Sequence, residues 1–157
     1  ANIWKEYGGK VDIILICSAW PDQPSNLLKY TSYVKCEYEL LKNLPIKISE
    51  TLNVPVAFCN ASHEIPYNMP FVGTMRCAGY SKIIDKGEVI ESIDSREERI
   101  ICGDVEITRK RKKIEPEKFN NWVNYSFLGN IERWLLEKIV SGLSKKRHQK
   151  LIKKLEN

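Results

Sequence analysis

The sequence predicts an α/β layered domain with a mixed sheet, followed by a C-terminal helical extension. Two short apolar runs, VDIILIC at 11–17 and VPVAFCN at 54–60, have the length and continuous hydrophobicity of buried strands. A helical pattern lies between them, and short β-type segments linked by tight turns follow the second run. This order of elements is typical of helices layered on a sheet.

The first 26 residues predict a helix end, a strand and a loop. Residues 1–10 have the pattern of a helix that Gly8 and Gly9 stop at its C-terminus. The nearly continuous apolar character of 11–17 predicts a strand that is covered on both faces. SAWPDQPSN at 18–26 contains two prolines and an Asp, so it predicts a loop.

The next segment predicts two helices and a second strand. Residues 27–44 mix apolar and charged positions and predict a helix that Pro45 interrupts. Since proline suits the first position of a helix, a new helix is expected over 45–53. The strand 54–60 follows directly, and the polar, proline-bearing residues 61–70 predict a loop.

Three further strands are predicted, over 80–84, 88–93 and 99–107, with short turns between them. The first turn falls in IIDKGEVI at 83–90. Gly87 can adopt the positive φ that a tight hairpin turn requires. We therefore expect a β-hairpin here, with turn residues that have no catalytic part.

The character of the chain changes after residue 108. The segment 130–143 predicts a helix with an apolar stripe. The stripe consists of Ile131, Trp134, Leu135, Ile139 and Leu143. The basic segment 145–157 continues as a helix. The predicted organisation is thus a domain at 1–108 and a basic, amphipathic helical extension at 109–157.

Length and composition indicate one soluble domain in a reducing compartment. A chain of 157 residues with 43% apolar residues suits one packed core, and no run approaches the ~20 apolar residues of a membrane span. The start lacks the pattern of a signal peptide and an initiator Met, so we expect it to lie inside a longer protein. Five cysteines without a CxxC pair favour a cytoplasmic location over a disulfide framework.

The basic excess lies in the tail. Residues 118–157 have a net charge of +6, whereas residues 1–117 have a net charge of −1. Such a tail can touch nucleic acid or an anionic membrane surface, but lysines of this kind are more often the solvated face of a helix. No aromatic platform for RNA accompanies them. The apolar stripe can equally pack on the domain, on a partner subunit or on a membrane.

Polar residues follow both apolar strands, where α/β sheets usually bind ligands. Ser18 and Asp22 follow the first strand, and Asn60 and Ser62 end and follow the second. These side chains either line a binding site or satisfy the backbone of the loops. The residues alone leave both interpretations open.

The sequence supports neither a thiol nucleophile nor a metal site in this chain. Cys17 ends the first strand, but no Cys-His-Asn spacing supplies the base that would activate it. Cys59 has His63 four residues later, although a strand leading into a loop would not naturally bring the two together. The two histidines are too few and too far from paired thiols for a zinc site.

Four segments, in order, resemble the second half of the carbon–nitrogen hydrolases, the nitrilase superfamily. They are GGKVDIILICSAWPD, ISETLNVPVAFCN, FVGTMRCAGYSKIIDKGEVI and EERIICGDVEI. Cys17 stands where the family often has Pro, Lys86 replaces a usual Pro, and extra residues precede Ser81. The resemblance covers residues 1–108.

This resemblance implies the second half of an α-β-β-α sandwich and thiol hydrolysis of a non-peptide C–N bond. The family's Glu–Lys–Cys triad lies before the segment that matches residue 1, and no cysteine here matches the nucleophile. No catalytic residue is therefore assigned to this chain. The residues expected to form a substrate-binding wall are Ser18, Ala19, Trp20 and Asn60.

The implied partners are a small amide, nitrile or carbamoyl substrate, the N-terminal half of the same domain, and further copies in a homo-oligomer. No cofactor is implied. Two alternatives stay open. The chain can be an inactive, nitrilase-like binding or scaffold protein, or its tail can define a membrane-surface or nucleic-acid-associated protein. A half-sandwich would leave apolar sheet faces uncovered and strand edges unpaired.

Overall fold

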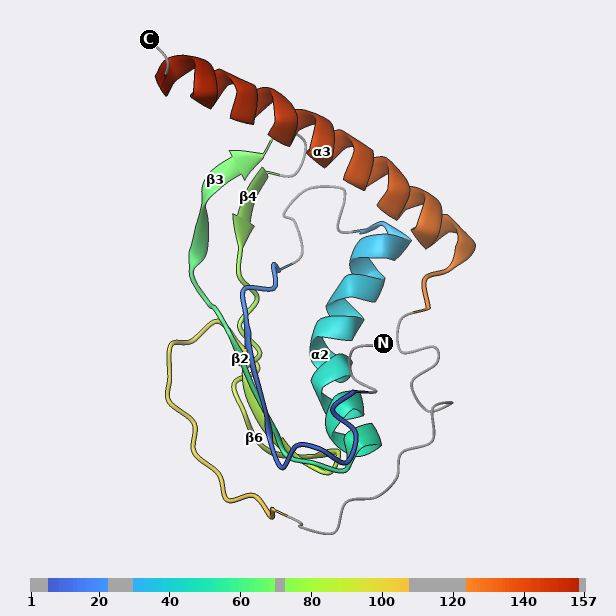
Figure 1. Ribbon diagram of the computed structural model, residues 1–157, viewed down its shortest axis with the longest axis vertical. Coiled ribbons are helices and arrows are strands. Elements are labelled where there is room, and N and C mark those ends of the chain that lie inside the picture. Colours follow the sequence, from blue (N-terminus) through green and yellow to red (C-terminus); the bar gives the residue numbers. More distant parts are fainter. Residues whose placement is uncertain (1–5, 23–29, 70–72, 108–123, 156–157) are drawn as a thin grey trace.

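The computed structural model describes residues 6–22, 30–69, 73–107 and 124–155. Figure 1 shows a helix against a sheet, a small β-ribbon, and a long helix that projects from them. The elements are β1 (Ile14–Ser18), α2 (Ser32–Leu52), β2 (Val56–Asn60), β3 (Glu64–Met69), β4 (Gly73–Arg76), β5 (Lys82–Asp85), β6 (Glu88–Ser92) and α3 (Phe127–Leu155).

The main sheet is mixed, as the sequence predicts. Its strand order is β1-β2-β5-β6, with β1 and β2 parallel and the other neighbours antiparallel. The connection from β1 to β2 contains α2, which lies along one face of the sheet (Figure 1). The described residues thus form one helical layer on one four-stranded sheet layer, with the ribbon β3–β4 beyond its end.

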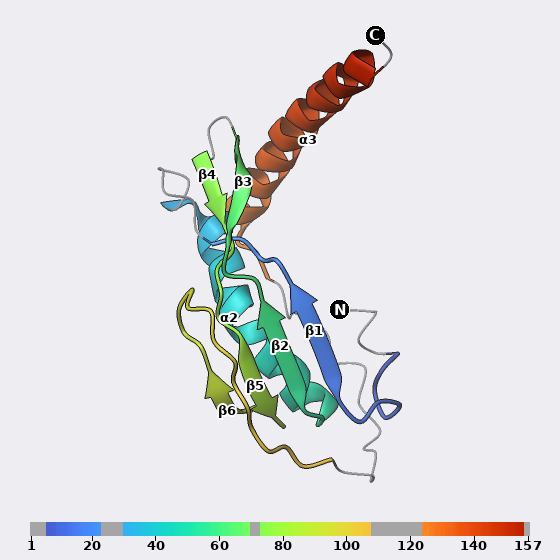
Figure 2. The same cartoon turned by 90° about the vertical axis from the view of Figure 1, so that its left-hand side faces the viewer.

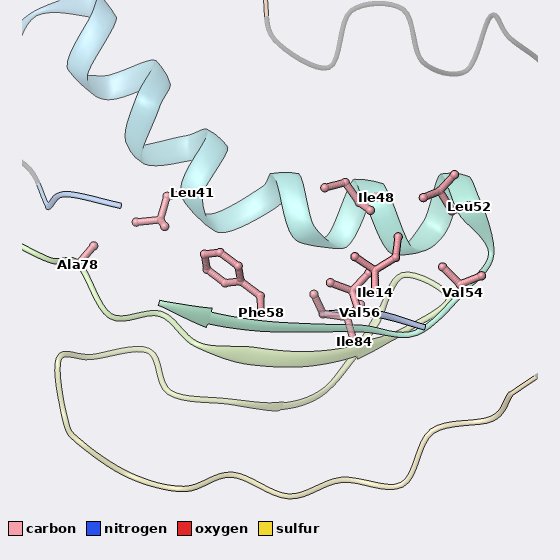
Figure 3. Packing of buried hydrophobic residues seen from close by; sticks show 9 residues of the cluster. All are labelled: Ile14, Leu41, Ile48, Leu52, Val54, Val56, Phe58, Ala78 and Ile84. Carbon is pink, nitrogen blue, oxygen red and sulfur yellow. The ribbon is translucent and has the colours of Figure 1, made fainter. Parts of the chain in front are cut away.

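The hydrophobic core fills the space between α2 and the sheet (Figure 3). The inward positions of β1, β2 and β5 alternate with outward ones, and they meet the apolar side of α2. The core residues are Ile14, Leu41, Ile48, Leu52, Val54, Val56, Phe58, Ala78 and Ile84. Each fully buried large side chain stabilises the fold by about 1.5–3 kcal/mol.

The other face of β1 and β2 is open among the described residues. Leu15 is 71% exposed, and both Cys17 and Cys59 are exposed. The expectation that 11–17 is covered on both faces is therefore wrong for this part of the chain. Since successive side chains of a strand point to opposite faces, the apolar run leaves half of its residues uncovered.

The strand predicted at 99–107 is absent. The segment crosses the outer face of the sheet at β5–β6, toward the viewer in Figure 2. A Cβ atom on Gly103 would lie 3.0 Å from Ile90 Cγ2, and the backbone N–H of Glu106 donates to Asp85 Oδ2 at 3.0 Å. Because this segment lies across the face of the sheet and not beside an edge strand, its backbone groups contact side chains. It therefore has no neighbouring strand with which to form a ladder of hydrogen bonds.

The loop predicted at 61–70 is wrong in its second half, where β3 pairs with β4 in an antiparallel ribbon. Pro66 lies in the irregular part of the register, between Glu64 and Asn68. A proline without an N–H is tolerated at such irregularities and at sheet edges. The proline therefore did not exclude a strand.

The helix break predicted at Pro45 is also wrong, because α2 continues through it. Pro45 has no N–H to donate to the carbonyl of Leu41. At this point the side chain of Lys82 reaches the helix and its Nζ donates to the carbonyl of Lys42 at 3.0 Å. Both Leu41 and Pro45 are buried, so packing against the sheet holds the helix together across the proline.

The expected hairpin at 83–90 is confirmed. Lys86 and Gly87 both have positive φ, 50° and 95°, which is the two-residue turn that suits twisted strands. Ser49 joins this turn to α2. Its hydroxyl accepts from the N–H of Gly87 at 3.2 Å and donates to the carbonyl of Val54 at 2.7 Å. The fully buried serine thus fixes helix, strand entry and hairpin together.

The helices predicted near the two ends of the chain differ from those in the structure. Residues 6–10 form turns, with Gly9 at φ +68°, and the rest of the helix expected at 1–10 lies outside the described residues. The two predicted C-terminal helical segments are one helix, α3. The residues 109–123 that precede it also lie outside the described part.

The start of α3 is anchored on α2, and the rest projects away (Figures 1 and 2). Glu132 accepts from the N–H of Tyr33 at 2.8 Å, and the ring of Tyr125 lies 5.6 Å from that of Tyr33. Phe127 and Trp134 are 79% and 57% exposed. Among the described helices, none combines the length and the apolar character needed to cross a membrane.

Replacing Ser49 with Ala is expected to lower the free energy of unfolding by about 1–2 kcal/mol, because it leaves the partly buried N–H of Gly87 without its acceptor. Urea-induced unfolding measures the change. Ser141→Ala is the matched control, since the hydroxyl of Ser141 is exposed on α3. Equal stability of the two variants would contradict this role of Ser49.

Candidate functional site

The carboxyl ends of β1 and β2 meet at one edge of the sheet, and Asn60 organises the loops there. Asn60 is 5% exposed. Its Oδ1 accepts from the N–H of Trp20 at 2.7 Å, and its Nδ2 donates to the carbonyls of Trp20 at 3.2 Å and Gly79 at 2.8 Å. Both amide donors are therefore used by backbone from two different loops.

Backbone hydrogen bonds reinforce this framework. The carbonyl of Ser18 accepts from Ala61 at 3.0 Å, and the carbonyl of Trp20 accepts from Ala78 at 3.0 Å. The hydroxyl of Ser81 accepts from the N–H of Asn60 at 3.0 Å. Each loop at this edge is thus fixed to its neighbours, which is what a preformed site requires.

Gly79 allows the closest approach between these loops. Its φ of +72° suits glycine, and a Cβ atom there would lie 2.1 Å from the carbonyl oxygen of Ser95. Tyr80 follows, also with a positive φ of 61°. The chain between β4 and β5 therefore bends sharply where it contacts the segment after β6.

A pocket of about 480 Å³ opens beside this framework, at the same edge of the sheet. One wall is the end of β2 and the loop that follows it, and the opposite wall is the segment after β6. Its lining residues are Cys59, Asn60, Ala61, Ser62, His63, Gly79, Ser81, Ile93, Ser95, Glu97, Glu98, Arg99 and Ile100. Their mixture of polar and apolar groups suits a small polar molecule.

The four residues predicted for substrate binding lie at this edge, but they are not all in the pocket. Asn60 lines it, whereas Ser18, Ala19 and Trp20 do not. Trp20 is partly buried and packs against the hydrophobic core. Contact of these residues with a substrate stays a prediction. The sequence left two interpretations open for Asn60, lining a binding site or satisfying the backbone of the loops. The hydrogen bonds of its side chain show the second.

Sequence reasoning missed the wall formed by residues 93–100. Ser95, Glu97, Glu98 and Arg99 all lie in this wall. The apolar residues 100 and 101 predict a strand at 99–107, whereas the chain from 93 to 100 is a loop that forms one wall of the pocket. The clustered charges of SREER were the available signal.

Cys59 and His63 both line the pocket, which does not itself bring the two side chains into contact, so the expectation that they stay apart remains a prediction. Cys59 is exposed at the end of β2, and His63 follows in the next loop. Within the described ranges, no three His, Cys, Asp or Glu side chains are grouped so that they could hold a metal ion.

A second polar cluster lies on the inner side of the sheet, against α2. Burial lowers the pKa of Lys82, which is 6% exposed, while Asp94 opposes this shift and Lys42 adds to it. The hydroxyls of Tyr38 and Tyr80 are 2.5 Å apart, and burial followed by this hydrogen bond raises the pKa of Tyr38. The Nζ of Lys42 lies 4.3 Å from the ring centre of Tyr38.

In comparisons with protein-family models, with curated proteins and with solved structures, no match to this chain was found. The resemblance to carbon–nitrogen hydrolases therefore stays a proposal that rests on the four sequence segments and on the geometry of the sheet.

Replacing Asn60 with Ala is expected to lower the free energy of unfolding by about 2–4 kcal/mol, because the N–H of Trp20 and the carbonyl of Gly79 lose their partner and the carbonyl of Trp20 keeps only its bond from Ala78. Chemical unfolding followed by tryptophan fluorescence measures this loss. Asn43→Ala serves as control, since Asn43 is exposed on α2 and bonds to Glu39. If both variants unfold at the same denaturant concentration, Asn60 does not hold the loops.

The buried ammonium of Lys82 predicts a specific pH dependence. Its pKa is lowered in the folded state, so between that pKa and 10.5 the unfolded chain binds a proton that the folded chain does not. Stability from this group therefore increases as pH rises through the window. The free energy of unfolding of the wild type, relative to Lys82→Met, should increase from pH 7 to pH 10.

The matched control is Lys47→Met, because Lys47 is exposed on the same helix. The difference between this variant and the wild type should show no such increase. A constant difference between wild type and Lys82→Met across the pH range would show that the ammonium is not desolvated.

Proposed function

We propose that residues 1–108 are the second half of a nitrilase-type carbon–nitrogen hydrolase domain. The chain would then take part in hydrolysing a non-peptide C–N bond of a small amide, nitrile or carbamoyl compound. The observation that carries this proposal is the open apolar face of β1 and β2, which ends at Cys59 in the wall of the pocket.

The layering supports the proposal. An α-β-β-α sandwich has two sheets packed face to face, with helices outside both. Here α2 covers the inner face of the sheet, and Leu15 projects from the outer face into solvent. A second sheet packed on that face would bury Leu15 and its neighbours, with a gain of about 1.5–3 kcal/mol for each large apolar side chain.

The parallel pair β1–β2 and the hairpin at 83–90 occur in the order that the resemblance requires. Parallel strands joined by a helix place their carboxyl ends at one edge, where α/β proteins bind ligands. The pocket lies at that edge. In this proposal its β2 wall and the segment 93–100 contact the substrate. Asn60 holds the β2 wall to the bend at Gly79, and the backbone of Tyr80 and Ser81 holds the segment 93–100.

The chemistry would come from the partner half of the sandwich. Its cysteine thiolate attacks the carbonyl or nitrile carbon, and its lysine stabilises the negative charge of the tetrahedral intermediate. Its glutamate donates a proton to the leaving nitrogen and then activates the water that hydrolyses the thioester. The contribution of this chain is a rigid wall that excludes water and orients the substrate.

The proposal includes a homo-oligomer, the N-terminal half as partner, and a cytoplasmic location. The exposed apolar residues of α3 favour contact with another subunit. A reducing compartment is consistent with cysteines that all carry free thiols in the structure.

The test is ammonia release from a panel of simple amides, nitriles and carbamoyl compounds by the complete natural protein that contains this chain. Replacing Cys17, Cys36 and Cys102, which do not line the pocket, is expected to leave at least about half of the activity, because none is the nucleophile. Iodoacetamide should still inactivate that variant. Leu15→Asp should lower activity about tenfold or more, since it places a charge in the layer between the sheets.

Two results would contradict the proposal. Absence of hydrolysis across the whole panel would exclude the reaction class. Loss of activity in Cys17→Ser or Cys59→Ser, with circular dichroism unchanged, would place the nucleophile inside this chain. Lys47→Asp is the control for Leu15→Asp and should retain activity, because Lys47 is exposed on α2, on the opposite side of the sheet from Leu15.

A further inference from the structure

Two exposed thiols stand side by side on the open face of the sheet. Cys17 of β1 and Cys59 of β2 are direct partners in the parallel register. Both are exposed. On either side of them in β2, Phe58 and Asn60 are buried, so strand alternation turns the two cysteines outward together.

The spacing of the strands suits a covalent bond between these residues. Neighbouring strands lie about 4.8 Å apart, within the range of about 4.4–6.8 Å that separates the Cα atoms of disulfide-bonded cysteines. Side chains of paired residues in parallel strands project in the same direction rather than toward each other. The bridge would therefore be slightly strained and easily reduced by small thiols.

The other cysteines lack this arrangement. Cys77 is buried, and Cys36 is half-buried on α2. Cys102 is exposed, but it lies in the segment that crosses β5–β6, and it has no cysteine as a strand partner. Within the described strand pairs, Cys17 and Cys59 alone oppose each other.

We propose that Cys17 and Cys59 are a redox-active cross-strand dithiol, which a small disulfide such as oxidised glutathione converts reversibly into an intramolecular disulfide. The thiolate of one cysteine attacks the glutathione disulfide, forming a mixed disulfide and releasing one glutathione thiolate. The second cysteine then attacks the protein-bound sulfur and releases the other glutathione. The protein loses two electrons and two protons, and glutathione disulfide is reduced to two thiols.

This inference goes beyond the proposed function and needs the register and the exposure of the two strands. It applies to the chain with its outer face open, because the second sheet of the proposed function would cover both thiols. It has a consequence for the pocket. Cys59 lines the pocket wall, so the bridge would remove a free thiol from the wall and tie β1 to β2 next to it.

The experiment uses the full 157-residue chain with Cys36→Ser, Cys77→Ala and Cys102→Ser, which leaves Cys17 and Cys59. The chain is equilibrated in glutathione buffers of increasing oxidised fraction, quenched with acid and alkylated. Mass spectrometry should show a monomer that lacks two hydrogens, carries no glutathione and links the two cysteine-containing peptides. Dithiothreitol should reverse the change.

The matched control keeps Cys17 and Cys102, both exposed, and replaces Cys59 with Ser. The proposed pair should reach half-oxidation at an oxidised glutathione concentration at least about tenfold lower than the control, because its second step is intramolecular between fixed neighbours. Peptide mapping of the oxidised wild type gives the same readout if the triple variant does not fold.

The proposal is overturned if the Cys17 and Cys59 chain stops at two glutathione mixed disulfides. It is also overturned if the control forms its internal bridge at the same glutathione ratio, or if the Cys17–Cys59 link forms only in denaturant. A reversible monomeric bridge specific to the folded pair supports it.

Discussion

The hydrogen bonds of the Asn60 carboxamide are the constraint on which the functional edge of this protein depends. One buried side chain ties the loop after β1, through Trp20, to the bend at Gly79. A buried amide that lost these partners would leave several backbone groups unsatisfied, so the native arrangement of the loops is strongly favoured. The pocket beside Asn60 takes its shape from this arrangement, because both of its walls begin at residues that Asn60 or Ser81 holds.

The main sheet has two faces with different tasks. The inner face, with Val56 and Phe58, packs on α2 and supplies most of the stability of the fold. The outer face, with Leu15 exposed, contributes little to the stability of the described residues. An apolar face that is left uncovered beside a pocket is a feature of interaction surfaces rather than of finished cores. In the proposed hydrolase, a second sheet would cover this face.

The sequence predicted the structure correctly where a local pattern allows only one backbone conformation. Gly87 has the positive φ of a hairpin turn. The two apolar runs are shorter than a typical helix, and both contain strands. It was misleading where tertiary packing decides. Pro45 stays inside a helix because the buried residues around it, such as Leu41 and Ile48, pack against the sheet. Apolar residues within 99–107 imitate a strand, yet the segment crosses a face of the sheet, and no local pattern distinguishes the two. The pocket wall at 93–100 was missed for the same reason.

Successive side chains of β2 point to opposite faces of the sheet, so neighbouring residues have different roles. Asn60 points inward and fixes the loops, while Cys59 points outward beside Cys17 and lines the pocket. A shift of one residue in the register of β2 would exchange these positions, placing a thiol where the loops need an amide and an amide where the thiols meet. The buried contacts of Val56 and Phe58 prevent that shift, because it would expose both to solvent. The hydrophobic core therefore determines which side chains reach the open face, and the reactivity of that face follows from packing on the opposite side of the sheet.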